Sequence, residues 1–250
     1  MNKIILSVLV LVLAAALCIG LTGCIHLSIN GSGIKGNGEV VTEEISLSKT
    51  LTGAVTQTSI DIVLDPALEG KAVLEGEENI LDLVEVNQSA GILTVDFKPS
   101  YQISWTHPVT LRVPIISGGL LETSSSGSIS MLGSDALKGD SFELRSSSSG
   151  SITVAIEAEK LKAIATSSGS INVTGRAAGA DIELSSSGSF NGFGCQTETV
   201  NAQLSSSGTA NVSVSGELSG SLSSSGCIYY DGDPAKVNVS SSSSGQARKR

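Results

Sequence analysis

The stretch Ser147-Ser148-Ser149-Gly150-Ser151-Ile152-Thr153-Val154 decides the fold, because close copies of it return throughout the second half of the chain. Successive glycines of these copies are separated by 23, 19, 19, 20, 18 and 19 residues. A period this regular is typical of a solenoid, in which each repeat forms one coil stacked on its neighbours. The glycines are Gly127, Gly150, Gly169, Gly188, Gly208, Gly226 and Gly245.

The residues around each glycine predict the path of a coil. Apolar side chains stand two and four residues after it, as in Ile171 and Val173, and four residues before it, as in Leu184. Each coil therefore supplies a strand, a polar corner and a second strand, and its apolar positions stack into internal ladders. We expect an all-β, right-handed single-stranded parallel β-helix with about 19 residues per coil. The corner glycine supplies either a positive φ or a close backbone approach.

The first part of the body predicts strands of a less regular kind. From Gly38 to Pro114 apolar and polar residues alternate in short runs, with Val73 among the positions expected to face inward. Turn signals such as Asp65-Pro66 separate these runs. The segment 77–84 is the only helix candidate, of one turn at most. Residues 38–245 have room for about eleven coils, of which the first four are expected to be irregular.

Composition limits the class of protein. Of the 250 residues, 40% are hydrophobic but only 3% aromatic, so the core must be built from Val, Ile, Leu and Ala. A disordered Gly/Ser linker is the alternative, but such linkers lack periodic apolar positions. The net charge of −9 is spread along the chain. Because no basic stripe exists, nucleic acid and anionic lipid head groups are not expected as partners.

The amino terminus predicts export and anchoring. A lysine, an apolar run over 4–21 and small residues before Cys24 make a secretory signal. Leu21-Thr22-Gly23-Cys24 looks like a lipobox, which implies cleavage before Cys24 and attachment of lipid to its sulfur. The alternative is an uncleaved transmembrane anchor. Ile25, where Asp would favour the inner membrane, points to the outer membrane if the host has one.

These features divide the chain into four segments. They are a lipoprotein signal peptide over 1–23, a flexible tether over 24–37, a β-solenoid domain over 38–246 and a basic tail over 247–250. Two cysteines, Cys195 and Cys227, lie in the solenoid domain. They fall two coils apart, an axial separation of about 9.6 Å that is too long for a disulfide. We therefore expect no disulfide between them.

No catalytic or cofactor-binding constellation accompanies the repeat. A catalytic serine needs a base, and the only histidines are His26, in the tether, and His107. Glu157 and Glu159 could form a carboxylate pair for sugar chemistry, but a solvated edge is the simpler interpretation. We therefore predict a protein that is not an enzyme and has no cofactor.

Two further segments carry alternatives. Asp231-Gly232-Asp233 lacks the remaining oxygen ligands of a calcium loop, so a turn before Pro234 is expected and no metal site. Segment 99–108 holds the only Trp, Trp105, between two prolines. It is either a contact loop or a connection whose Trp105 covers the end of the solenoid.

Several blocks in a fixed order resemble a known bacterial family. They are Thr58-Ser59-Ile60-Asp61-Ile62-Val63-Leu64, Glu75-Gly76-Glu77-Glu78-Asn79-Ile80-Leu81, Gly91-Ile92-Leu93-Thr94-Val95, the Ser-Gly-Ser-Ile coils and Tyr230-Asp231-Gly232-Asp233-Pro234. Over residues 38–246 the chain is similar to the auto-transporter adhesin head, or GIN-domain, family. The family's aromatic residue in the first strand is replaced here by Leu51. The resemblance implies a right-handed β-helix at the cell surface, with no catalytic residues to carry over.

The sequence therefore predicts a non-enzymatic, lipid-anchored β-solenoid of the cell envelope, attached to the membrane through Cys24. Its expected partner is an envelope protein or a glycan, which it would bind as an adhesin or surface binding protein. The alternatives are an envelope-stress sensor that partners a membrane signalling system, and a polysaccharide-processing β-helix. End-to-end pairing through open strand edges is a further option.

Overall fold

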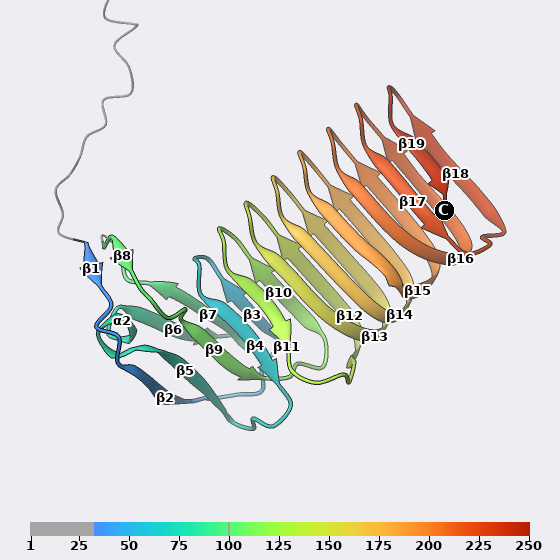
Figure 1. Cartoon of the computed structure of the whole chain (residues 1–250). Helices are drawn as coiled ribbons and strands as arrows, with labels where there is room; N and C mark the ends of the chain where they lie inside the picture. The colour runs from blue at the N-terminus through green and yellow to red at the C-terminus, as the bar shows by residue number, and fades with distance from the viewer. Residues whose placement is uncertain (1–32, 100) are drawn as a thin grey trace, which may run out of the picture. The chain divides into compact units, whose positions relative to one another are not determined.

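The structure is a computed structural model that describes residues 33–99 and 101–250 (Figure 1). Its elements are almost all strands. They are β1 (Ile34–Lys35), β2 (Val40–Ser46), β3 (Gly53–Thr56), β4 (Asp61–Asp65), β5 (Lys71–Glu77), α2 (Glu78–Leu81), β6 (Val84–Ser89), β7 (Ile92–Phe97), β8 (Ile103–Ser104), β9 (Thr110–Pro114), β10 (Gly119–Thr123), β11 (Ser128–Met131), β12 (Leu137–Ser146), β13 (Ser151–Ala165), β14 (Ser170–Leu184), β15 (Ser189–Leu204), β16 (Thr209–Leu222), β17 (Cys227–Asp231), β18 (Lys236–Ser241) and β19 (Gln246–Lys249).

The repeat forms a β-solenoid of about 19 residues per coil, as its period predicts. Each long strand begins after one serine-glycine corner, bends midway and ends at the next corner, so its two halves lie in opposite faces of the solenoid. The first half of β14 pairs in parallel with β13 and β15, and so does its second half. Figure 1 shows these strands stacked side by side from β12 to β19.

Stacked apolar side chains fill the space between the two faces. One ladder places Ile152, Ile171, Phe190, Ala210 and Ile228 in register, and all five are buried. Full burial of a large apolar side chain contributes about 1.5–3 kcal/mol. A coil gains this contribution only when its neighbours cover it, so the coils stabilise each other.

The amino-terminal part, from β2 to β9, combines irregular parallel layers, as expected, with antiparallel strands, and is called the cap below. The β3–β4 layer lies between the β10–β11 layer and a layer made of β7 and β9, which come later in the chain. Beyond that layer, β5 pairs antiparallel with β9 and β2, while β6 pairs antiparallel with β7. The expectation of about eleven coils is therefore wrong, because two stretches of chain turn back as antiparallel strands.

This antiparallel pairing also corrects one core position. In β5 the inward side chains are Ala72 and Leu74, both buried, whereas Val73 is half-buried and does not face the core as expected. The expected single turn of helix is present as α2, whose Ile80 and Leu81 are buried. Asp65, at the end of β4, accepts a hydrogen bond from Ala67 N and pairs with Arg112 of β9, which joins two neighbouring layers.

Strands extend beyond both expected limits of the solenoid domain. The β1 strand, within the 24–37 segment, pairs with β8, and β19 runs through the 247–250 segment as far as Lys249. Across residues 33–99 and 101–250, none of the helices has the length and apolar character needed to cross a bilayer. The predicted signal peptide and the predicted lipidation site, Cys24, lie outside the described residues.

Candidate binding surface at the serine corners

Serine and glycine have different roles at each corner. The positive φ expected at the glycine falls instead two residues earlier, on a serine: Ser167 has φ 57°, Ser186 56° and Ser206 58°. The glycine meets the second expectation, a close backbone approach. A Cβ added to Gly188 would lie 2.2 Å from the carbonyl oxygen of Ala165 in the preceding coil. Only glycine fits there without moving backbone.

Backbone hydrogen bonds continue through the corner. In one corner the Gly188 N–H closes the turn on Ser185 O at 3.0 Å, and the Ser187 N–H bonds to Ser167 O of the preceding coil at 2.7 Å. The backbone is thus held by other backbone groups, and the hydroxyls are not needed for that purpose. A corner hydroxyl approaches the main chain only at long range, as for Ser205 Oγ at 3.5 Å from Leu184 O.

Buried hydroxyls are found in the earliest layers of the stack, just before the corner. Thr56, Thr123 and Ser146 stack in register and are buried. Thr123 Oγ1 bonds to Gly127 O and Ser146 Oγ to Gly150 O, both at 2.7 Å. In later coils the same position is Ala165 and then leucine, so the polar ladder becomes apolar.

A groove of about 530 Å³ runs beside the corners of the later coils. One side is formed by the outward side chains that precede the corner, and the other by the first residue of each corner. Within the described chain, the half-buried hydroxyls of Ser185 and Ser223 make no hydrogen bond to protein, so they are free to bind a ligand or water. The two rows are Ile164, Glu183, Gln203, Ser221 and Ser240, and Thr166, Ser185, Ser205, Ser223 and Ser242.

The groove is close to electrically neutral. Glu183 is the only charged residue that lines it, and its carboxylate lies 3.4 Å from the Lys162 ammonium. Its polar groups are therefore mainly hydroxyls, repeated at the coil spacing of about 4.8 Å. This surface is not among the sites predicted from the sequence. The sequence feature that marks it is a polar residue five positions before each corner glycine and directly before the buried leucine, as at Glu183, Gln203 and Ser221.

The two carboxylates considered for sugar chemistry do line one groove, of about 860 Å³, at the bend opposite the corners. Glu157 lies 3.7 Å from Lys138 and 3.6 Å from Arg176, and Glu159 is exposed. Glu157 is therefore held in two surface ion pairs, and Glu159 faces solvent. This geometry suits the interpretation as a solvated edge.

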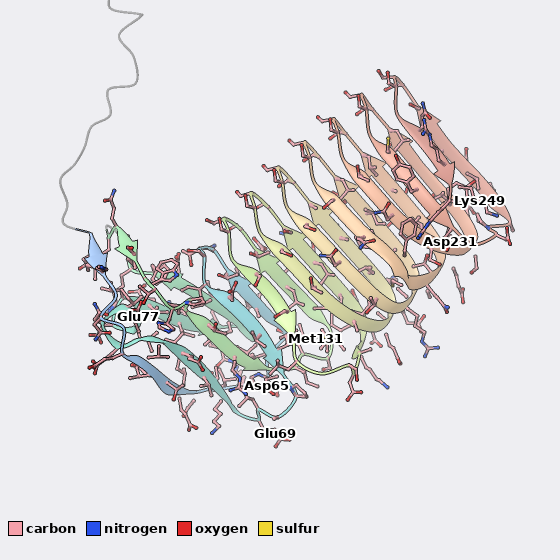
Figure 2. The ribbon with its side chains drawn as sticks, in the orientation of Figure 1. Asp65, Glu69, Glu77, Met131, Asp231 and Lys249 are labelled. Atoms are coloured by element: carbon pink, nitrogen blue, oxygen red, sulfur yellow. The ribbon has the colours of Figure 1, made fainter. Side chains whose placement is uncertain are left out.

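The Asp231–Asp233 segment forms the expected turn. Gly232 has φ 93°, and its N–H bonds to Asp231 Oδ1. Asp233 pairs with Lys249 (labelled in Figure 2), whose hydrogen bond and charge lower the pKa of the Asp233 carboxyl. Among the described residues no group of three or more His, Cys, Asp or Glu side chains could hold a metal ion.

Trp105 takes the covering position in the amino-terminal cap. Its ring lies 5.4 Å, centroid to centroid, from that of Phe97 and packs against the core. The two cysteines are unpaired: Cys195 is buried at the bend, where burial raises the pKa of its thiol to about 11, and Cys227 follows a corner.

Solved structures share this fold. A putative adhesin from Bacteroides fragilis superposes with a TM-score of 0.77 at 17% identity, covering 87% of this chain and 100% of its own. A putative lipid binding protein from Parabacteroides distasonis reaches 0.67 at 22% identity, covering 87% and 99%. A putative adhesin from Parabacteroides merdae reaches 0.61 at 18%, covering 87% and 99%.

The curated proteins contain no match to the chain. A family model does match, over residues 50–234. That range includes β3 and β4, the antiparallel cap strands β5 and β6, and the regular coils as far as the Asp231–Asp233 turn. The chain therefore belongs to the family described as "Putative auto-transporter adhesin, head GIN domain".

Proposed function

We propose that this protein is a non-enzymatic, lipid-anchored binding protein of the cell envelope, whose solenoid presents the serine-corner groove to an envelope glycan or protein. The observation that carries the proposal is the groove itself. The hydroxyls of Ser185 and Ser223 make no hydrogen bond within the described residues, and the one carboxylate of the groove pairs with Lys162. Such a surface suits an uncharged polar partner, because no charge has to be buried without compensation.

The family supports a surface-exposed binding role, since its members are described as adhesin heads. The lipobox supports the anchor, because two acyl chains, at about 0.8 kcal/mol per buried methylene, hold a protein durably on a membrane. Radiolabelled palmitate should enter the wild-type chain in its host. It should not enter a Cys24→Ala variant, and equal labelling of both would refute the anchor.

Binding is tested by capture of cell-wall glycans and envelope proteins on the immobilised full chain. Ser205→Tyr places a ring in the groove, and we expect it to reduce capture at least tenfold. Ser215→Tyr is the matched control, because Ser215 lines the groove at the bend. Equal loss in both variants would point to a general effect on the fold. Loss in Ser215→Tyr alone would move the binding surface to the bend, and no capture by wild type would contradict the proposed role.

A further inference from the structure

The serine-corner groove repeats the same pair of positions on successive coils. Its two rows come from the first residue of each corner and from the residue two positions before it, and strand pairing keeps the rows in register. Figure 1 shows these coils stacked side by side from β13 to β18, so the rows run along the stack. A ligand that lies in the groove therefore meets an equivalent pair of positions about every 4.8 Å.

The groove offers hydrogen-bonding groups beside apolar carbon. Within the described chain, the hydroxyls of Ser185 and Ser223 and the amide of Gln203 make no hydrogen bond to protein. Hydroxyl and amide groups can each donate and accept a hydrogen bond. Leu184 and Leu204 stand between the two rows and also line the groove. A ligand with hydroxyl edges and apolar C–H faces, which is the chemistry of a sugar ring, matches this lining.

The charge of the groove favours a neutral ligand. Its one carboxylate, Glu183, lies 3.4 Å from the Lys162 ammonium, and the whole chain has a net charge of −9. An anionic chain would be repelled by the protein and would find no cation among the described residues that line the groove. A cationic chain would find only a carboxylate that is already paired. The groove therefore suits an uncharged polysaccharide better than a charged one.

An extended peptide fits the groove less well than a polysaccharide does. The backbone N–H groups of Ser185, Ser205 and Ser223 already bond to the preceding coil, so the groove offers no strand edge that a peptide could extend. Peptide residues repeat at about 3.3 Å and would fall out of step with coils about 4.8 Å apart. One sugar unit of an extended β-linked polysaccharide is close to the coil spacing in length, so such a chain stays in step.

We propose that the serine-corner groove binds an uncharged, extended β-linked polysaccharide along the stack, with one sugar unit on each coil. This inference rests on the proposed function and names the class of partner. Each unit exchanges hydrogen bonds with the polar groups of one coil and places a C–H face on the apolar lining. Among the described residues of the groove none is aromatic, so no ring stacks on the sugar. Each coil therefore contributes little alone, and affinity grows with the number of coils that the chain spans.

Titration calorimetry of the full chain, in a detergent without a sugar head group, tests this assignment. The probes are β-1,4-linked chains of glucose and of N-acetylglucosamine, with two to five sugars. Each added sugar should lower the Kd about threefold, which is the gain from roughly one net hydrogen bond. Chains of α-1,4-linked glucose, which curve, should gain little with length. A β-1,4-linked uronic acid chain of five sugars should bind about tenfold more weakly than the neutral chains.

Two alanine variants test the direction of the bound chain. Ser185 and Ser223 lie two coils apart, about 9.6 Å along the stack, so only a chain that runs along the groove contacts both. Each of Ser185→Ala and Ser223→Ala should raise the Kd of the five-sugar chain about threefold, and the double variant should multiply the two effects. Ser187→Ala is the matched control, because Ser187 shares a corner with Ser185 but does not line the groove. It should bind as wild type does, and circular dichroism shows that each variant is folded.

The outcomes separate this inference from the function on which it rests. If neither β-linked series binds while envelope proteins are captured through the groove, the polysaccharide is wrong and the proposed function stands. A Kd that does not fall with chain length, or a loss in only one of the two alanine variants, would overturn the arrangement of one sugar on each coil. Equal loss in Ser187→Ala would overturn the assignment of the site to the groove. A wild type that binds no probe and captures no partner would contradict both proposals.

Discussion

At the scale of single residues, each corner needs one residue with a positive φ and one residue without a Cβ. The sequence predicted that one glycine meets both needs, but in the structure a serine has the positive φ and the glycine makes the close approach. Serine takes the left-handed conformation, for which a non-glycine residue normally loses about 1–2 kcal/mol. Glycine takes the position where the preceding coil leaves no room for a Cβ. The repeat therefore needs glycine at the crowded position, because a serine there would place its Cβ against the preceding coil.

The close backbone approach at Gly188 predicts that alanine at this position destabilises the protein more than alanine at Gly179. Gly188→Ala brings a Cβ against the carbonyl oxygen of Ala165 and should lower the free energy of unfolding by about 1–3 kcal/mol. Gly179→Ala is the control, because its Cβ would meet the Thr199 hydroxyl at 3.3 Å and the backbone of Glu159 at no less than 3.9 Å. Urea denaturation measures both, and equal losses would contradict the crowding argument.

The positive φ at Ser186 predicts a different series. Ser186→Val should destabilise the protein by about 1 kcal/mol or more, since a β-branched residue tolerates φ 56° poorly. Ser186→Gly should change stability by less than about 0.5 kcal/mol, because relief of strain is offset by greater freedom of the unfolded chain. Chemical denaturation of the three proteins checks this order. A valine variant as stable as wild type would contradict it.

At the scale of elements, the regular coils were predictable and the cap was not. The coil length and the inward positions, such as Ile171 and Leu184, follow from the sequence repeat. This is because each coil pairs with the coil that directly precedes or follows it in the sequence. The cap depends on pairings that skip along the chain, such as β5 with β9 and β7 with β3. Alternation predicted Val73 as a core position, whereas the antiparallel pairing of β5 turns Ala72 and Leu74 inward. The groove was not predicted from the sequence, because its residues are mostly polar but of different types, so they form no recognisable motif.

Glu77 joins three segments of the cap and predicts a pH-dependent element. Its fully buried carboxylate accepts hydrogen bonds from Gly38 N and from Thr106 N and Oγ1 (Figure 2). Burial alone would raise the pKa of this carboxyl, but the hydrogen bonds outweigh it and hold the pKa below its usual value of 4.5. The carboxylate therefore stabilises the cap above pH 4.5, and this contribution is lost as pH falls through the lowered pKa.

Trp105 reports this loss directly, because it is the only Trp and adjoins Thr106. We expect its fluorescence to change in an acid titration with a midpoint below pH 4.5 while the coils remain folded by circular dichroism. The Glu77→Gln variant should lack that step, since its neutral amide does not titrate. An identical step in the variant would assign the titration to another group.

At the scale of the whole molecule, the coils and the cap should differ in how they tolerate deletion. Each regular coil contacts only its neighbours, so stability is close to a sum over coils. Removing residues 170–188 joins Gly169 to Ser189. Ile152 would then stack on Phe190 in place of Ile171, so the apolar ladder is preserved. The protein should fold, with a urea m-value reduced roughly in proportion to the lost length.

Removing the equally long segment 53–71 should prevent folding, although it contains no serine-glycine corner. It deletes the β3–β4 layer, to which β7 and β10 on one face and β9 and β11 on the other are all paired. Among the strands of residues 33–99 and 101–250, only this layer pairs β7 and β9 with β10 and β11, and no neighbour in sequence can replace it. Circular dichroism and cooperative urea unfolding distinguish the two deletions. A folded 53–71 deletion would show that cap and coils are independent, and that the solenoid can begin at β10 without the layer on which it is built.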